Sequence, residues 1–175
     1  MTRRFDEALI APLVALRAGV RPATPLDDRP LAPGLGFRRD PAARMTGQWQ
    51  SPRGRLLELE TAVEHPGDWL GLHLALPLPD LAGIAWLGFA LRLAAGRAQV
   101  ARACLRSGRP EGGFHDQFFD RHILAQSAVT DHHDLLAPDH WPDLPQRAPW
   151  REFILFLPPE RGIALALHDL RLFTL

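Results

Sequence analysis

The sequence contains no lysine, no asparagine and no tyrosine, and its only cysteine is Cys104. All 20 basic residues are therefore arginines, and 20 acidic residues balance them. We interpret the missing residue types as the codon usage of a GC-rich, bacterial genome, because their codons are rich in A and T. A single cysteine excludes an internal disulfide. Without net positive charge the chain also lacks the electrostatic attraction of a general nucleic-acid binder, so no nucleic-acid partner is expected.

Long apolar runs are also absent, and none approaches the roughly 18 residues that are needed to span a bilayer. The start, MTRRFDEALIAPLVALRAG, resembles a signal peptide in having basic residues before a short apolar run. Asp6 and Glu7 interrupt the basic region, however, and Arg17 stands where small residues should precede a cleavage site. We therefore expect a cytoplasmic protein with no membrane span.

Apolar residues near the N-terminus follow helical spacing. Leu9, Leu13 and Leu16 lie on one face of a helix expected over residues 5–17. Pro12 interrupts this segment, and a proline removes a backbone donor from a helix interior. We expect a helix that is broken at Pro12, or a shorter one that begins there.

Residues 19–44 carry five prolines and three glycines. Because proline cannot donate a hydrogen bond to a neighbouring strand, this composition predicts an extended arm that contributes no strands to a sheet. We expect the arm to pack over the rest of the protein, or to dock on a protein partner or on a second copy in a homodimer. The chain is thus divided into residues 1–48, with the helix and the arm, and residues 49–175, which form one domain.

From residue 54 onward the apolar pattern has a period of two, which is typical of half-buried strands. In RLLELETAV, for example, Leu57 and Leu59 alternate with Glu58 and Glu60. The expected strands lie within residues 55–63, 69–76, 83–96, 98–105, 114–125, 151–159 and 162–175. Strands of this kind, joined by loops with proline and glycine, predict an all-β fold, an antiparallel two-sheet β-sandwich of the jelly-roll type.

The last expected strand, GIALALHDLRLFTL, changes its apolar phase part-way. Leucines occupy odd positions up to Leu167 and even positions from Leu170 onward. Because a slip of one residue moves every side chain to the other face of a sheet, we predict a β-bulge near His168 and Asp169.

The end of the chain, APWREFILFLPPERGIALALHDLRLFTL, resembles the closing strands of galactose-binding-like jelly rolls, the fold of many carbohydrate-binding modules. The resemblance rests on a core strand at 153–157, a short turn with proline and glycine at 158–162, and a final L-x-D-L-x-L pattern at 167–172. It covers residues 46–175 in pattern and the last 28 residues in motif. It implies a non-catalytic, glycan-binding role, and it maps no ligand-binding residue onto this chain.

The run TDHHDLLAPDHWPDLPQRAPW, residues 130–150, concentrates histidines, aspartates and tryptophans. Its four prolines fix the backbone at intervals, so we predict a stiff surface loop, which loses little entropy when a ligand binds. An exposed indole can stack on a sugar ring while polar side chains meet the hydroxyls. The predicted ligand-binding residues are Trp141, as the stacking platform, with Asp131, His132, His133, Asp134 and His140. Alternatively, the run is a passive connector between two sheets.

His132, His133 and His140 are also the candidates for a metal site. Zinc ligands usually follow other spacings, and adjacent histidines on an extended strand point to opposite faces. Surface histidines and turn-capping aspartates explain the run better than a bound ion. No cofactor is indicated, although calcium or zinc would suit the aspartates and histidines.

A second polar segment, GGFHDQFFDRH at 112–122, would place Phe114, Asp116 and Phe118 on one face of a strand. Because aspartate is depleted from sheets, we expect the strand to begin near Phe118, with Asp116 in the preceding loop. The alternative is a strand that faces a ligand.

Among the tryptophans, Trp69 and Trp86 fall within expected strands and should be core, Trp141 should be exposed, and Trp150 should anchor the start of a central strand. Arginines expected in loops could bind the carboxylates of an acidic polysaccharide in bidentate fashion. They are Arg38, Arg39, Arg53, Arg55, Arg106 and Arg109.

Catalytic signatures are scarce, since none of the three serines lies in a nucleophile elbow and no phosphate-binding loop or dinucleotide fingerprint occurs. The favoured function is a carbohydrate-binding sandwich that serves a surface-polysaccharide system. The second is a structural or interaction protein that docks through its proline-rich arm. The third is a metal-dependent enzyme built on the histidine cluster.

Overall fold

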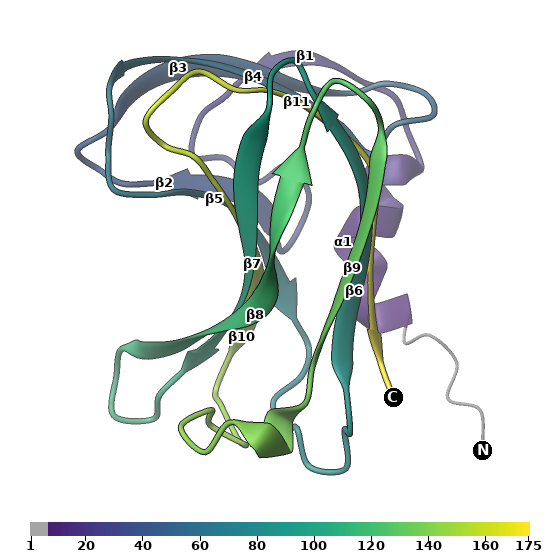
Figure 1. Ribbon diagram of the computed structural model, residues 1–175, viewed down its shortest axis with the longest axis vertical. Helices are drawn as coiled ribbons and strands as arrows, with labels where there is room; N and C mark the ends of the chain where they lie inside the picture. The colour runs from purple at the N-terminus through teal and green to yellow at the C-terminus, as the bar shows by residue number, and fades with distance from the viewer. Residues whose placement is uncertain (1–6) are drawn as a thin grey trace.

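Leucines at every second position build two facing layers of strands (Figure 1). In β5 (Leu70–Leu76), for example, every leucine is buried between the layers. The computed structural model describes residues 7–175. The predicted antiparallel β-sandwich of the jelly-roll type is confirmed.

The two antiparallel sheets contain all eleven strands of the described residues. Sheet A has the order β1 (Arg21–Pro25), β3 (Arg44–Ser51), β4 (Leu57–His65), β11 (Ala164–Thr174), β6 (Leu87–Ala95) and β9 (Thr130–Leu136). Sheet B has the order β2 (Leu35–Arg39), β5, β10 (Arg151–Leu157), β7 (Gln99–Gly108) and β8 (Phe114–Ala125).

The centre of the sandwich is aromatic. The ring of Phe89 on β6 lies 4.9 Å from that of Phe119 on β8 and 5.2 Å from that of Phe153 on β10, measured between centroids. These contacts join the middle of sheet A to two strands of sheet B. The core is therefore continuous between the layers, and each sheet keeps one outward face.

The predicted bulge in the last strand is confirmed. Pairing of β11 with β6 shifts register between Leu167 and Asp169. On both sides of the shift the leucines remain in the core, because the extra residue restores their phase.

The expectation that residues 19–44 would contribute no strands is wrong, because β1 and β2 both form there. β1 pairs with β3, and β2 pairs with β5. Each of the two is the edge strand of its sheet, and an edge strand tolerates proline because one of its sides needs no donor. β3 crosses the expected boundary between residues 48 and 49.

The expectation of a helix broken at Pro12 is also wrong. Pro12 lies inside the continuous helix α1 (Glu7–Arg17), and the part of the expected helix at residues 5–6 lies outside the described residues. Leu9, Leu13 and Leu16 are each at most 1% exposed. Burying them contributes roughly 1.5–3 kcal/mol each, more together than the roughly 3 kcal/mol that an interior proline costs.

Helix α1 covers one open side of the sandwich, beside β11 (Figure 1). Nη2 of Arg17 donates to the carbonyl of Leu170 over 3.2 Å, and the hydroxyl of Ser51 donates to the carbonyl of Leu16 over 3.4 Å. Within residues 7–175 no helix has the length and apolar character to cross a membrane.

Candidate functional site

The predicted binding run at 130–150 is not a loop throughout, because its first seven residues form β9 at the edge of sheet A. The first of the four prolines is Pro138, so none of them lies inside the strand. The prediction of a stiff loop over the whole run is therefore wrong for residues 130–136. Residues 137–150 contain one short 3-10 helix, Pro138–His140, and otherwise form the connection to β10.

The strand separates four predicted ligand residues. Opposed residues of an antiparallel pair project to the same face of a sheet. Asp134 is opposite the core residue Phe89, and His132 is opposite Leu91, so both face the interior. Asp131 and His133 project outward and are exposed. His132 and His133 therefore do not converge on one ligand.

Asp134 and His132 have structural roles. One carboxylate oxygen of Asp134 accepts a hydrogen bond from the backbone N–H of Arg121 over 2.8 Å, which ties β9 to β8 across the open side of the sandwich. His132 stacks on Phe89 with 5.7 Å between ring centroids. Burial lowers the pKa of His132 and outweighs the opposing effect of Asp134, so its ring is neutral at pH 7.

His140 and Trp141 lie beyond the strand. Trp141 is 37% exposed, as expected, whereas Trp86 is 39% exposed rather than core. The imidazole of His140 meets the indole of Trp86 edge-on, with 6.3 Å between centroids. Trp86 precedes β6 instead of lying within it, which explains its exposure.

No group of three or more His, Cys, Asp or Glu side chains in residues 7–175 is placed to hold a metal ion. His132 faces the core, and His133 faces outward. The three candidate metal ligands, with His140 in the 3-10 helix, are thus distributed over different surfaces.

The second polar segment is a strand from Phe114 onward, and the expected late start near Phe118 is wrong. β8 begins at Phe114, and its register places Phe114, Asp116 and Phe118 opposite outward residues of β7. Asp116 is tolerated there because Arg106 binds it through two hydrogen bonds of 2.7 Å. This segment and its neighbours form the outer face of sheet B.

Arginines and phenylalanines alternate across this outer face. The guanidinium carbon of Arg102 lies 4.0 Å from the ring centroid of Phe118, and that of Arg106 lies 3.8 Å from the centroid of Phe114. Phe118 in turn packs against Phe156 on β10, with 5.8 Å between centroids. The result is a patch of ring faces and fixed polar groups shared by three strands, which we call the Arg–Phe patch.

A buried charged group adjoins the Arg–Phe patch. Nδ1 of His73 lies 2.9 Å from a carboxylate oxygen of Glu152, and Arg38 lies 3.3 Å from the other oxygen. Burial would raise the pKa of Glu152, but the hydrogen bond and electrostatic interaction with His73 and the positive charges of Arg38 and Arg106 outweigh it and lower that pKa. Glu152 is therefore a carboxylate held in place at neutral pH.

Cys104 and Trp150 adjoin the Arg–Phe patch, one beneath it and the other at its edge. Cys104 is fully buried beneath it, and burial raises the pKa of its thiol, which makes it a poor nucleophile. Trp150 immediately precedes β10, is 43% exposed and covers Gly108, where a Cβ would have no room. The indole thus extends the aromatic surface beyond the end of β7.

No family model matches the sequence, and no curated protein matches it. Solved structures do match. A xylan-binding domain, CBM22-1 of Xyn10C from Paenibacillus barcinonensis, has a TM-score of 0.55 and 7% identity, over 89% of this chain and 94% of that one. The family 11 carbohydrate-binding module of the cellulosomal cellulase Lic26A-Cel5E of Clostridium thermocellum has a TM-score of 0.55 and 15% identity, over 90% and 97%.

A CBM4 structure gives a TM-score of 0.57 at 7% identity, over 98% of this chain and 100% of that one. The chain shares their fold. The carbohydrate-binding-module-like resemblance noted at the C-terminal end of the sequence thus extends over the whole β-sandwich.

The sequence indicated Arg106 and left open that the strand face with Phe114 and Phe118 meets a ligand, but it did not combine them into one site. Arg102 and Arg106 lie four positions apart on one strand, and Phe114 and Phe118 have the same spacing on the next. This double alternation was the available signal for a polar and aromatic outer face. Phe156 could not be added from the sequence, because its place beside Phe118 depends on the strand order β10-β7-β8.

Proposed function

We propose that the protein binds glycan chains through the Arg–Phe patch on the outer face of sheet B. The observation that carries the proposal is the alternation of ring faces with bidentate polar groups, above all Phe114 and Phe118 with Arg106 and Asp116. We further propose that this glycan is part of a surface polysaccharide, which is the role that the sequence analysis favoured.

The chemistry of a sugar suits this surface. A pyranose presents an apolar C–H face that packs on an aromatic ring, and hydroxyls at its rim that pair with carboxylates and guanidiniums. By analogy with base stacking, one such contact contributes about 1–3 kcal/mol. Because Arg106 is already held by Asp116, little side-chain entropy is lost on binding.

The structural neighbours support the proposal by their ligands. One of them is described as a xylan-binding domain. A family 11 carbohydrate-binding module from Clostridium thermocellum was solved in complex with a β-1,3-1,4-mixed-linked tetrasaccharide, and this chain matches that structure with a TM-score of 0.52.

The test is the Phe114→Ala variant, assayed on a glycan array and then by calorimetry with the best ligand. Phe114 is 50% exposed, so its loss should leave the melting temperature nearly unchanged while affinity falls about tenfold or more. Leu124→Ala is the matched control, because Leu124 is 53% exposed on the same strand and lies at its opposite end. Equal losses of affinity in the two variants would contradict the proposal.

Trp141→Ala separates this surface from the loop surface predicted from the sequence. Trp141 is exposed in the segment that follows β9 and lies outside the Arg–Phe patch. We expect Trp141→Ala to bind the glycan as the unmodified protein does. If Trp141→Ala lost glycan binding while Phe114→Ala bound normally, the glycan site would be in the loop rather than on the Arg–Phe patch.

A docking role for residues 19–44 has less support than glycan binding. Both β1 and β2 in this segment are members of the sheets, so it is not a free arm. The hypothesis of a metal-dependent enzyme also has little support, because His132 and His133 point to opposite faces of β9.

A further inference from the structure

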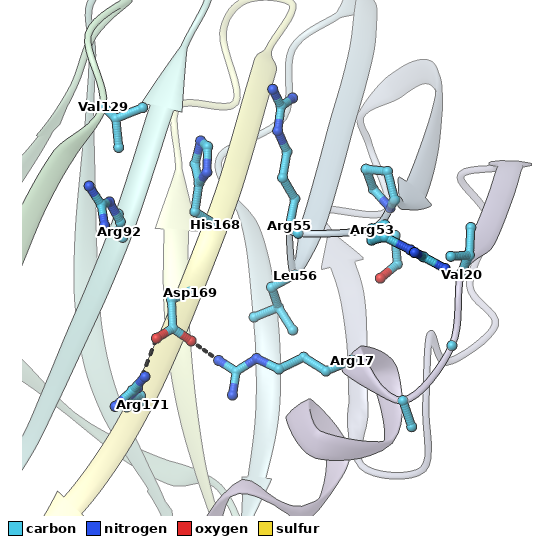
Figure 2. Close-up of a pocket in the computed structure, with 15 residues that line it drawn as sticks. Arg17, Val20, Arg53, Arg55, Leu56, Arg92, Val129, His168, Asp169 and Arg171 are labelled. Atoms are coloured by element: carbon cyan, nitrogen blue, oxygen red, sulfur yellow. Dashed lines mark hydrogen bonds and ion pairs between the residues drawn. The ribbon is translucent and has the colours of Figure 1, made fainter.

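A basic pocket lies on the side of the sandwich opposite the Arg–Phe patch. It has a volume of about 880 Å³ and forms where the end of α1, the residues before β4, the bulge of β11 and the outer side of β6 meet (Figure 2). Arginines dominate its lining: Arg17, Arg53, Arg55, Arg92 and Arg171. His168 and Asp169 complete the charged and titratable residues that line it.

The bulge in β11 is what brings His168 into the pocket. Successive residues of a regular strand point to opposite faces, so only one of His168 and Asp169 would face outward. The register shift between Leu167 and Asp169 lets both line the pocket. In Figure 2 the side chains of His168 and Arg55 project in the same direction, and Arg92 lies on the neighbouring strand.

Two of the arginines have a structural partner. Asp169 binds Arg17 through one carboxylate oxygen and Arg171 through the other, the latter over 2.8 Å (Figure 2). This network attaches the end of α1 to β11. Arg17 and Arg171 therefore have a structural role, because both bind Asp169.

Of the other three arginines, two have a carboxylate partner, whereas Arg53 has none among the described residues. Arg55 is paired with Glu58, while Arg92 lies 3.7 Å from Asp131 with both side chains mostly exposed. No side-chain ion pair or hydrogen bond of Arg53 occurs within residues 7–175. Five guanidiniums thus face three carboxylates. The pKa of His168 is lowered by burial and then by Arg55 and Arg92, opposed by Glu58, so these charges act on the same space.

A second hollow continues the pocket along sheet A. Its volume is about 400 Å³, and it shares Arg55, Val129 and His168 with the first. Small residues leave its floor open: Ala94, Gly96, Ala164 and Ala166. Glu58 and Glu60 at its rim can accept hydrogen bonds from hydroxyl groups. The space beside the basic pocket therefore suits a flat, hydroxyl-bearing ring.

We propose that the basic pocket binds the oxyanion group of an acidic glycan, a uronate carboxylate or a sulfate or phosphate ester, whose sugar ring lies over the alanine floor of the adjoining hollow. Guanidinium groups recognise these oxyanions through paired hydrogen bonds. Arg55, Arg92 and His168 are the binding residues. The glycan nature of the ligand rests on the proposed function, but the site is a second one on the other sheet.

Calorimetry with four probes tests the proposal: inorganic sulfate, a sulfated disaccharide, a uronate-containing disaccharide and a neutral disaccharide. The variants are Arg55→Gln and Arg92→Gln, whose surface ion pairs contribute little to stability. Arg161→Gln is the matched control, because Arg161 has an exposed ion pair of 3.4 Å with Glu160 and does not line the pocket. Melting temperatures verify that each variant is folded.

We expect the acidic disaccharides to bind more tightly than inorganic sulfate. Each pocket variant should bind these disaccharides with about tenfold lower affinity than the unmodified protein. Arg161→Gln should lose nothing. The proposal is overturned if no probe binds, if Arg161→Gln loses as much as the pocket variants, or if inorganic sulfate binds as tightly as the sugars. Phe114→Ala distinguishes the two sites. This variant should bind the acidic disaccharides with unchanged affinity, whether or not the Arg–Phe patch binds glycans.

Discussion

Arg151 is the residue that attaches the 137–150 segment to the sandwich. Its side chain is 1% exposed, and it donates to the carbonyls of Leu78 (2.8 Å) and Gln146 (3.0 Å), as well as to Pro145 and to Ser107. Burial lowers the pKa of Arg151 to about 10, so the guanidinium remains charged at neutral pH. A buried cation with this many oxygen partners is needed for the fold rather than for binding.

Replacing Arg151 by Met should lower the free energy of unfolding by about 3 kcal/mol, because the carbonyls it serves lose their donors. Urea denaturation measures the change. Arg147→Met is the control, since the Arg147 side chain is 86% exposed and its 3.0 Å ion pair with Asp80 lies at the surface, where solvent screens it. Similar midpoints for the two variants would contradict this role of Arg151.

At the scale of elements, the sequence was most informative where leucine alternation was uninterrupted. Each of the seven expected strands has its counterpart in β4 to β8, β10 and β11. The prolines in β1 and β2 prevented these strands from being predicted. A proline destabilises a central strand much more than an edge strand, and the sequence does not show which strands are at an edge. Aspartates concealed the start of β8 for a related reason. Asp116 is acceptable in a sheet only because Arg106 comes to lie beside it.

Sites were harder to predict than strands. The phase change in the last strand correctly located the bulge, but the sequence did not indicate that a pocket would form beside it. That pocket requires α1, the residues before β4, and β6 to meet at the bulge, and these segments are distant in the chain. The residues of the predicted loop site do not share one surface, for the opposite reason. Residues close in sequence were assigned to one surface, and β9 directs His132 and His133 to different faces.

Removal of residues 1–44 tests whether the N-terminal segment is part of the fold. The truncation deletes α1, β1 and β2 and exposes the surface that Leu9, Leu13 and Leu16 cover. Burial of the three leucines contributes roughly 4–9 kcal/mol, compared with a total stability of about 5–15 kcal/mol for a typical domain. We expect loss of cooperative thermal unfolding, measured by circular dichroism. An unchanged melting temperature would show that the segment is dispensable.

For the whole molecule, a net charge of zero conceals an uneven distribution. On sheet A five arginines around the pocket are paired with three carboxylates. On sheet B Arg106 is paired with Asp116 and Arg38 with Glu152, while Arg102 lies over the ring of Phe118. Long-range fields therefore differ between the two outer faces even though the total cancels.

Salt should separate the two proposed sites. Raising sodium chloride from about 50 mM to about 500 mM shortens the Debye length and screens exposed charges. We expect affinity for an acidic disaccharide to fall several-fold, while affinity for a neutral glycan on the Arg–Phe patch stays nearly constant. Calorimetry at both salt concentrations measures this, and parallel losses for the two ligands would argue against separate sites.

The back-to-back arrangement of the two sheets has a consequence for how the protein would meet a polymer. The outer faces of the two sheets point away from each other (Figure 1). The Arg–Phe patch lies on the outer face of sheet B and the basic pocket on that of sheet A, with the hydrophobic core between them. A stiff polysaccharide cannot follow both faces without turning around the sandwich, so the two sites do not gain avidity from one straight chain. Each protein molecule would instead hold two chains and act as a crosslink of valency two in a polysaccharide network.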